Sequence, residues 1–299
     1  MNYLFIMYPW ENVKPETDTT LRLIHEVAER GYQVAITVGE NLTIRDCLPM
    51  AFCKVFKKGK VPKSIPNFHK TATFNDQMLP LAGFDVIFMR ANPPLDAIVL
   101  NFLDSVKNQV FIINSVEGLR EANNKLYPAA FYDPKNEIIP ATHVSKNKEY
   151  LKRVIKESKS DKMIMKPLNG YGGSGVIVLE KGADQNISSL LDFYISGKSE
   201  SNYVIVQEYV EGAEKGDIRV LMLHGEPIGA MRRIPASGDA RSNLSAGGTY
   251  AKHTLTKAEK RLCKVVGAKL VKDGLFFVGL DLIEEKLIEV NVLSPGGIT

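Results

Sequence analysis

Two acids and an amide near the end of the chain show a pattern that suits a divalent cation. Asp281 lies in the apolar run 276–283, and Glu289 and Asn291 lie in the run 286–293. If both runs are strands joined by a three-residue turn, Asp281 lies opposite Glu289, with Asn291 on the same face. Mg²⁺ prefers hard oxygen ligands, and unpaired acids inside apolar strands are costly. The pattern predicts a Mg²⁺ site, with Mn²⁺ as a second candidate; the alternative is a salt bridge to a lysine.

A glycine-rich loop follows the apolar run that ends at Lys166. Gly170, Gly172 and Gly175 fit G-x-G-x-x-G, but the residues after them indicate a strand, whereas the dinucleotide fingerprint needs a helix there. The Walker phosphate loop also fails, because no Gly-Lys-Ser/Thr closes this loop. Glycines between two strands can bring backbone N–H groups to phosphates, and Lys166 would add a point charge. We expect a phosphate-binding loop here; the alternative is an ordinary hairpin loop.

Two arginines stand in neighbouring apolar runs that suit an antiparallel hairpin. Arg219 precedes the turn at His224-Gly225-Glu226, and Arg233 follows it. A three-residue turn would set both arginines on one face and a two-residue turn would separate them, so both arrangements stay open. The Gly/Ser/Ala-rich stretch 235–250 comes next, and structureless loops of this length are usually functional.

The first part of the chain indicates an open parallel α/β domain. Apolar runs predict strands at 3–7, 33–38, 85–89 and 110–113, separated by helical patterns. Residues 40–80 resist assignment. The segment 90–96 follows a strand, at the edge of the sheet where open parallel sheets bind ligands. Its Pro93-Pro94 pair stiffens it, and either peptide bond can be cis.

The remaining two thirds of the chain mix strands and helices. We expect helices at 117–131, 147–158, 187–195 and 256–273, and strands at 138–144 and 203–210 besides the hairpins above. The fold class is therefore α/β with α+β. We expect an N-terminal domain over 1–120, a glycine-loop subdomain over 121–202 and a C-terminal subdomain over 203–299.

Bulk composition excludes several classes of protein. The 299 residues carry a net charge of +4, and no basic run is interleaved with aromatic residues, which argues against nucleic-acid binding. No apolar run approaches a membrane span, and the first residues lack a signal peptide's basic region. The three cysteines form no metal-ligand spacing and suggest free thiols in a reducing cytoplasm.

Several motifs together resemble the ATP-grasp fold and, within it, the prokaryotic glutathione synthetase family. They run in order from about residue 85 to the end, and the first 80 residues match loosely. The matching stretches are Met89-Arg-Ala-Asn-Pro-Pro, Asn114 with Leu119-Arg-Glu-Ala-Asn-Asn-Lys125, Lys166-Pro-Leu-Asn-Gly-Tyr-Gly-Gly, Gly216-Asp-Ile-Arg-Val, Arg233-Ile-Pro, Arg241-Ser-Asn-Leu-Ser-Ala-Gly-Gly248, Phe277-Val-Gly-Leu-Asp-Leu-Ile and Glu289-Val-Asn-Val-Leu-Ser-Pro.

The resemblance implies roles for individual residues. Arg219 and Arg233 would be catalytic and stabilise the transferring phosphoryl group, and Asp281, Glu289 and Asn291 would hold two Mg²⁺ ions. The residues implied to bind ATP are Lys125, Lys166, Asn169, Gly170, Gly172, Gly173, Gln207, Glu208, Tyr209, Val210 and Asp217. Those implied to bind the other substrates are Arg90, Asn92, Arg241, Asn243, Ser294, Gly296 and Gly297.

The implied reaction is an ATP-dependent ligation. The carboxylate of γ-glutamylcysteine would attack the γ-phosphate of ATP, and glycine would displace phosphate from the acyl phosphate to give glutathione. Such chemistry needs positioning, charge neutralisation and exclusion of water more than a nucleophilic side chain. The loop 239–248 would close over the site. The family also implies a dipeptide and an amino acid as small-molecule partners, and a dimer or tetramer of identical chains.

Some positions depart from the family pattern. Asn92 stands where Asp is usual, Glu16 and Thr17 where lysines are usual, and Gly296-Gly297 where Thr follows Ser-Pro. The family also continues into a closing helix after the position of Thr299, so we expect either a longer chain or a missing cap. These departures leave open another ATP-grasp ligase with a different peptide or amino acid. An ATP-binding regulatory protein is a third hypothesis, which the intact charged residues disfavour.

Overall fold

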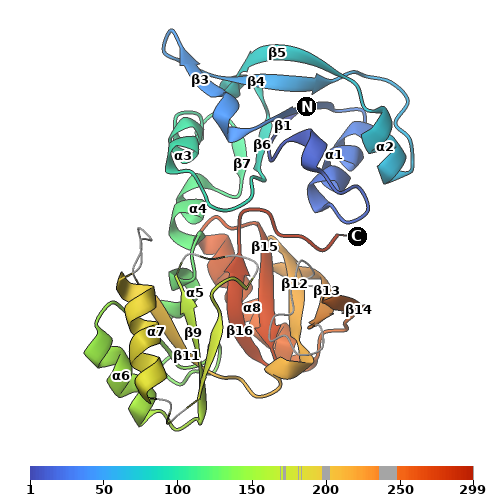
Figure 1. The fold of residues 1–299 in the computed structure, drawn as a ribbon. Helices are drawn as coiled ribbons and strands as arrows, with labels where there is room; N and C mark the ends of the chain where they lie inside the picture. The colour runs from blue at the N-terminus through green and yellow to red at the C-terminus, as the bar shows by residue number, and fades with distance from the viewer. Residues whose placement is uncertain are drawn as a thin grey trace.

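The structure is a computed structural model that describes residues 1–168, 170, 173–180, 182, 184–196, 203–235 and 248–298. Its strands form a seven-stranded, a four-stranded and a five-stranded sheet. Figure 1 shows the first sheet and its helices above the other two, which lie side by side. The chain therefore forms three successive units, each built around one of these sheets.

The N-terminal domain contains the seven-stranded sheet. Its strand order is β3-β4-β2-β1-β6-β7, with β5 paired to β4. The bounds are β1 (Asn2–Ile6), β2 (Gln33–Thr37), β3 (Leu42–Arg45), β4 (Leu48–Phe56), β5 (Phe74–Pro80), β6 (Val86–Met89) and β7 (Phe111–Ile113). The parallel prediction is confirmed for β2, β1, β6 and β7, whereas β3, β4 and β5 are antiparallel. These three strands were not predicted, because polar residues such as Arg45, Lys54 and Asp76 interrupt their apolar stretches.

Helices cover both faces of this sheet. Helix α1 (Thr19–Glu29) begins at Asp18, whose Oδ1 accepts the backbone N–H of Leu21 at 2.8 Å, as an N-cap does. It packs with α2 (Ile65–Thr71) against the face that carries Phe5. Helix α3 (Ala97–Asp104) covers the opposite face. The peptide bond between Pro93 and Pro94, just before α3, is cis, as the sequence allowed.

The four-stranded sheet forms a lid subdomain with the order β10-β9-β11-β8. Its strands are β8 (Thr142–Ser145), β9 (Lys162–Pro167), β10 (Ile177–Glu180) and β11 (Val204–Glu208). The glycine loop joins β9 to β10, as predicted, and the predicted strand 138–144 is shorter and later than expected. Helices α6 (Lys148–Glu157) and α7 (Asp184–Ser196) pack on one face of the sheet.

The predicted helix over 117–131 is wrong as a single element. It consists of α4 (Val116–Ala122) and α5 (Leu126–Ala129), separated by a break at 123–125. Asn124 favours the break because its Oδ1 accepts the backbone N–H of Leu126 at 2.9 Å, in competition with helical hydrogen bonding. The break brings the N–H of Lys125 to the carbonyl of Leu168 at 3.4 Å.

The five-stranded sheet belongs to the C-terminal subdomain and has the order β14-β13-β12-β15-β16. Its strands are β12 (Asp217–Leu223), β13 (Glu226–Ile234), β14 (Thr249–Lys252), β15 (Phe277–Ile283) and β16 (Lys286–Asn291). Helix α8 (Lys257–Lys272) packs against it and begins with a capping box between Thr256 and Glu259.

Two separate hydrophobic cores are relevant to the site. One core runs without interruption from the N-terminal domain (Leu4, Leu100) into the five-stranded sheet (Val220, Leu280). The lid has its own core, formed by α6, α7 and its sheet. Asn114 reinforces the first junction, since its Oδ1 accepts the N–H groups of Phe276 and Phe277 at 2.7 Å each. The lid is therefore the unit that shares least buried apolar surface with the others.

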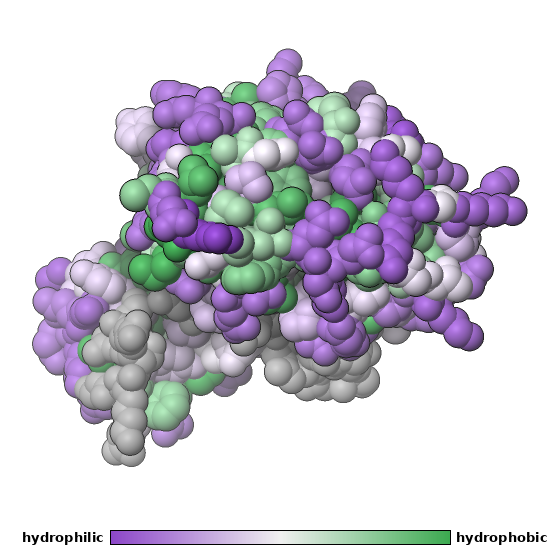
Figure 2. All heavy atoms as spheres, turned by 90° about the horizontal axis from the view of Figure 1, so that it is seen from above, coloured by the Kyte–Doolittle hydropathy of each residue, from purple (hydrophilic) through white to green (hydrophobic). Residues whose placement is uncertain are grey.

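The upper face of the N-terminal domain mixes hydrophilic and hydrophobic side chains (Figure 2). Figure 2 looks down on the N-terminal domain and shows hydrophobic side chains emerging between charged ones. Exposed large hydrophobic residues of this domain include Ile44, Leu48, Phe52, Ile98 and Phe111. Among the described residues, no helix combines the length and apolar character that crossing a bilayer requires.

Candidate active site

The hairpin of β12 and β13 carries the two arginines on one face. Its turn has two residues, because Leu223 pairs with Glu226, so the three-residue turn we considered is wrong. A bulge between Leu221 and Met222 adds the missing residue and shifts the register. Arg219 and Arg233 therefore point to the same side of the sheet. A three-residue turn without a bulge would give the same arrangement.

The hairpin of β15 and β16 also combines a two-residue turn with a bulge. Ile283 pairs with Lys286 across a two-residue turn, and a bulge next to Asp281 shifts the register so that Asp281 lies opposite Glu289. The predicted pairing is confirmed, although the predicted turn length is wrong. Because β12 pairs with β15 and Arg219 lies opposite Asp281, the two hairpins present one charged face.

Asp281 is the centre of this face. Its Oδ1 accepts Nε of Arg219 at 2.5 Å, and its Oδ2 accepts Nη2 of Arg219 at 3.0 Å. Nη2 of Arg233 lies 3.0 Å from the same Oδ2. Asp281 is 5% exposed, and burial alone would raise its pKa, but the two guanidinium groups lower that pKa to about 2. The carboxylate is therefore charged at any physiological pH.

Asp217 and Asn291 complete the network around Asp281. Asp217 forms a two-point ion pair with Arg233, with Nε–Oδ1 at 2.6 Å and Nη2–Oδ2 at 2.8 Å. Burial and the charge of Asp281 raise the pKa of Asp217. Asn291 donates its amide to Asp281 Oδ2 at 3.1 Å. The two arginines are thus held in fixed positions by carboxylates before any substrate arrives.

Two lysines face the charged centre from the lid side. Lys125 Nζ lies 3.2 Å from Glu289 Oε1 and donates to the carbonyl of Gly170 in the glycine loop. Lys166 Nζ donates to Gln207 Oε1 at 2.9 Å. Lys166 is 6% exposed, and burial lowers its pKa to about 8 although Glu289 acts in the opposite direction. Among the described residues, Lys166 has no direct carboxylate partner, and a buried cation of this kind suits an anionic ligand.

A narrow pocket separates the lid from β16 at this point. Its described lining includes both lysines, apolar side chains and Gln207, whose Nε2 donates to Thr142 Oγ1 at 2.7 Å. Its volume of about 10 Å³ is enough for one water molecule and too small for a nucleobase. In this structure the space between the lid and β16 is therefore closed to a nucleobase.

The terminal segment 294–298 lies between the charged face and the N-terminal domain (Figure 1). Arg90, 2% exposed, donates Nη2 to the carbonyl of Pro295 at 3.0 Å. Ser294 donates to Asn92 Oδ1 at 3.3 Å. On the other side, Arg219 Nη1 lies 3.5 Å from the carbonyl of Gly296. The predicted substrate residues Arg90, Asn92, Ser294 and Gly296 therefore come together, 200 residues apart in sequence.

Several other residues predicted to bind ATP or substrate do not line the narrow pocket or lie outside the described residues. Glu208 follows Gln207 on β11 and points to the opposite face, because strand side chains alternate. Glu208, Tyr209 and Val210 are absent from the described lining of the narrow pocket. Gly173 has a φ of +74°, which favours glycine. The predicted residues Asn169, Gly172, Arg241 and Asn243 lie outside the described residues.

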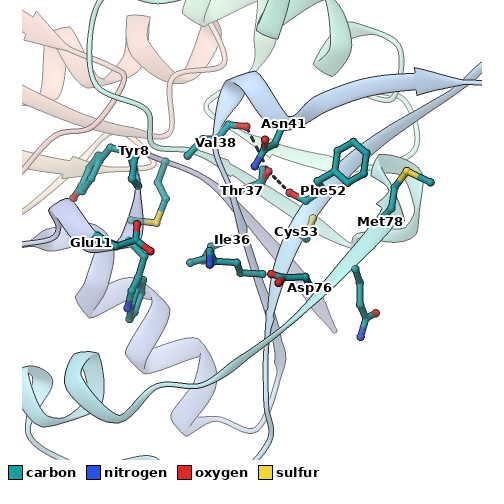
Figure 3. A pocket seen from close by; sticks show the side chains of 15 residues that line it. Tyr8, Glu11, Ile36, Thr37, Val38, Asn41, Phe52, Cys53, Asp76 and Met78 are labelled. Atoms are coloured by element: carbon teal, nitrogen blue, oxygen red, sulfur yellow. Dashed lines mark hydrogen bonds between the residues drawn. The ribbon is translucent and has the colours of Figure 1, made fainter.

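A larger pocket that sequence analysis missed lies in the N-terminal domain (Figure 3). It has a volume of about 470 Å³ and lies beyond the ends of β1 and β2, with Tyr8, Trp10 and Phe52 in its wall. The sequence feature that could have indicated this pocket is the Met7-Tyr8-Pro9-Trp10 stretch directly after the first strand. Among its described lining residues Lys54 is the one cation, whereas phosphoryl transfer requires several. We therefore place the reaction at the charged face.

The charged face offers oxygen ligands for a divalent cation. Both N–H groups of the Asn291 amide are engaged, by Asp281 at 3.1 Å and by the carbonyl of Gly279 at 3.4 Å, which leaves its Oδ1 as an acceptor. Glu289 and Asp281 add carboxylate oxygens. Among the described residues, no group of three or more His, Cys, Asp or Glu side chains is placed so that it could hold a metal ion by itself. The donor set fits Mg²⁺ when phosphate oxygens complete the coordination, which is how Mg²⁺ usually binds.

Comparison with known proteins follows the same division of the chain. Residues 1–120 match the model of the prokaryotic glutathione synthetase N-terminal domain, and residues 124–299 match the ATP-grasp domain of the same family. The glutathione synthetase of Gloeobacter violaceus is 36% identical over 309 aligned positions, covering 100% of this chain and 90% of the relative. That of Vibrio cholerae is 31% identical and covers 97% of this chain and 88% of the relative.

Solved structures share the fold at much lower sequence identity. The D-cycloserine synthetase DcsG has a TM-score of 0.62 at 15% identity and covers 98% of this chain and 92% of its own. The D-alanine-D-alanine ligase of Coxiella burnetii has a TM-score of 0.59 at 8% identity, covering 98% and 86%. Together, the two domain models and the full-length relatives show that the chain belongs to the prokaryotic glutathione synthetase family of ATP-dependent carboxylate–amine ligases.

Proposed function

We propose that this chain uses ATP to join γ-glutamylcysteine to glycine and thereby makes glutathione. The observation that carries the proposal is the arrangement around Asp281, which two arginines share at 2.5–3.0 Å while Lys125 and Lys166 face it from the lid. Two arginines on the charged face and two lysines on the lid side supply the positive charge that a transferring phosphoryl group needs, because its charge is spread over several oxygens. Family membership supports the choice of substrates.

The lid side of the site is the proposed nucleotide end. Lys166 loses hydration on burial and would recover a charge partner from a phosphate oxygen, which makes it a binding group for ATP. Lys125 is tied to Gly170 and would carry the glycine loop with it. Gln207 positions Lys166 through its hydrogen bond. The apolar lining of the narrow pocket, including Ile205 and Leu287, is suited to an adenine ring once the lid opens.

Glu289, Asn291 and Asp281 would hold Mg²⁺, which would neutralise phosphate charge during the transfer. Asp281 has a second task, since it fixes the guanidinium planes of Arg219 and Arg233 toward the phosphoryl group. An acyl phosphate hydrolyses readily, so closure of the lid would protect it from water. The proposed chemistry needs no side-chain nucleophile, because the substrate's own carboxylate would attack the phosphate.

The test is ADP release by the purified protein with Mg-ATP and γ-glutamylcysteine, with and without glycine. Release that requires both substrates, together with glutathione in the product, supports the proposal. Release that appears only with another carboxylate or amine would keep the ligase and change its substrates. Arg233→Ala should lower turnover about a hundredfold or more, as loss of a transition-state charge does, while ATP still binds; full turnover would contradict its catalytic role.

We also propose that the chain forms a homo-oligomer, a dimer or tetramer, as the family resemblance implies. The hairpin of β3 and β4 exposes Ile44, Leu48 and Phe52 at 63, 59 and 53%. Exposed apolar side chains of this size favour association with a second copy. Sedimentation of the wild type against an Ile44→Lys, Phe52→Lys variant tests this: the wild type should sediment as an oligomer and the variant as a smaller species. A monomeric wild type would contradict it.

A further inference from the structure

One side chain of the N-terminal domain holds the end of the chain in place. Thr19 Oγ1 accepts the backbone N–H groups of Gly297 at 3.0 Å and Ile298 at 3.3 Å, 278 and 279 residues away in sequence. Thr19 is 4% exposed, so water competes poorly for these hydrogen bonds. Neither the motifs in the sequence nor the family comparison assigns Thr19 a role.

The position of Thr19 is fixed by the start of helix α1. Asp18 caps the helix through Leu21 N at 2.8 Å, and it also accepts a hydrogen bond from the hydroxyl of Tyr8. Thr19 is the first helical residue after this cap. A β-branched side chain at a capped helix start has few rotamers available, so its hydroxyl oxygen points in a defined direction.

The opposite side of the terminal segment faces the charged centre. Arg219, which is paired with Asp281, lies with Nη1 3.5 Å from the carbonyl of Gly296. Arg90 holds the carbonyl of Pro295 at 3.0 Å, and the hydroxyl of Thr20 in turn accepts Nε of Arg90 at 3.1 Å. The segment thus lies between the beginning of α1 and the residues proposed for phosphoryl transfer.

We propose that Thr19 is a positioning residue for the amine substrate. By fixing the N–H groups of Gly297 and Ile298, it sets the backbone of residues 295–298 at the place where the amine must approach the acyl phosphate. This inference rests on the proposed function and extends it, because binding of the amine would then depend on the N-terminal domain. The nucleotide end of the site, at Lys125 and Lys166, has no contact with Thr19 among the described residues.

Thr19→Val tests this, because valine keeps the shape of the side chain and removes the acceptor oxygen. We expect the KM for glycine to rise roughly tenfold, as loss of two buried hydrogen bonds implies, while the KM for ATP stays within twofold. Thr19→Ser keeps the oxygen and should restore the wild-type KM. Thr71→Val is the matched control and should change nothing, because among the described residues the Thr71 hydroxyl bonds only the carbonyl of Asn67 in its own helix α2.

A second measurement separates the two steps of the reaction. Acyl phosphate formed without glycine can be trapped with hydroxylamine, and Thr19→Val should form it at the wild-type rate. An unchanged KM for glycine, or equal rises in the KM of all three substrates, would overturn the positioning role.

Amide hydrogen exchange distinguishes failure of this inference from failure of the proposed function. Faster exchange at Gly297 and Ile298 in Thr19→Val but not in Thr19→Ser supports the positioning role whichever substrates the wild type uses, and unchanged exchange overturns it. A wild type that releases no ADP with γ-glutamylcysteine and glycine contradicts the proposed function alone.

Discussion

Arg219 and Asp281 lie directly opposite each other on adjacent antiparallel strands and share two hydrogen bonds, at 2.5 and 3.0 Å. The pair is buried, with the arginine side chain 12% and the aspartate side chain 8% exposed. Two fixed hydrogen bonds define the plane of the guanidinium group. Beyond this pair, Nη1 of Arg219 lies 3.5 Å from the carbonyl of Gly296 in the terminal segment.

Asp281→Asn removes the charge that both arginines share. We expect the free energy of unfolding to fall by about 3–5 kcal/mol, because breaking a buried ion pair leaves uncompensated charge. Turnover should fall about a hundredfold, since the arginines lose their fixed orientation. Urea unfolding and ADP release measure the two effects. Asp46→Asn is the control, because Asp46 lies in an exposed turn and pairs only with Arg45 at 3.6 Å; an equal loss there would contradict the prediction.

ATP binding should take up a proton above neutral pH. Burial lowers the pKa of Lys166 to about 8 in the free protein, so part of the population is uncharged at pH 8, and a nearby phosphate would raise that pKa again. Uptake should therefore grow from pH 7 to pH 9 and reach about half a proton near pH 8. Calorimetry in two buffers of different ionisation enthalpy measures it. Lys166→Gln should abolish the uptake, and identical heats in both buffers for the wild type would show the assignment to be wrong.

The metal requirement should depend on Glu289. Glu289→Gln removes a hard anionic ligand and the partner that Lys125 contacts at 3.2 Å. We expect ATP binding to need at least about tenfold more Mg²⁺, with a similar shift for Mn²⁺. Titration of each ion at constant ATP gives the comparison. Glu285→Gln changes the exposed turn of the same hairpin and should behave like the wild type. Matching ion dependence in both variants would exclude Glu289 as a ligand.

The two glycines of the terminal segment should differ in their tolerance of a side chain. Gly297 has a φ of +134°, and a Cβ there would lie 2.7 Å from Met231 Cε. At Gly296 the nearest atom would be Thr19 Oγ1 at 3.9 Å. Gly297→Ala should therefore cost about 1–3 kcal/mol of stability and lower use of the amine, whereas Gly296→Ala should keep both. Thermal unfolding and KM for glycine provide the comparison, and equal effects would contradict it.

Much of the charged face could be predicted from the sequence, because period-two alternation assigns side chains to faces once the register is known. Register was the uncertain step. Both hairpins combine a two-residue turn with a bulge, and a bulge leaves no composition signal as clear as a turn does. The pairing of Asp281 with Glu289 was predicted correctly, because a three-residue turn and a two-residue turn with one bulge place the same residues opposite each other beyond the bulge.

Long-range contacts explain what sequence analysis missed. The role of Thr19 depends on backbone N–H groups 278 residues away, and no local pattern announces such a partner. The strands β3, β4 and β5 were missed because short apolar stretches broken by polar residues give no clear period-two pattern. The break before α5 was missed because Asn123 and Asn124 stand in an otherwise helical pattern, where propensity is a weak guide.

The separate core of the lid has a consequence for how the protein comes apart. Among the described residues, Leu151 and Leu191 pack within the lid's own cluster, while the N-terminal domain and the five-stranded sheet share one core. Cooperative units of unfolding follow shared buried surface. Strands β8 to β11 and helices α6 and α7 should therefore lose structure as one foldon at lower denaturant than the rest, so that partial unfolding would abolish nucleotide binding before it disturbs the joined core of the other two units.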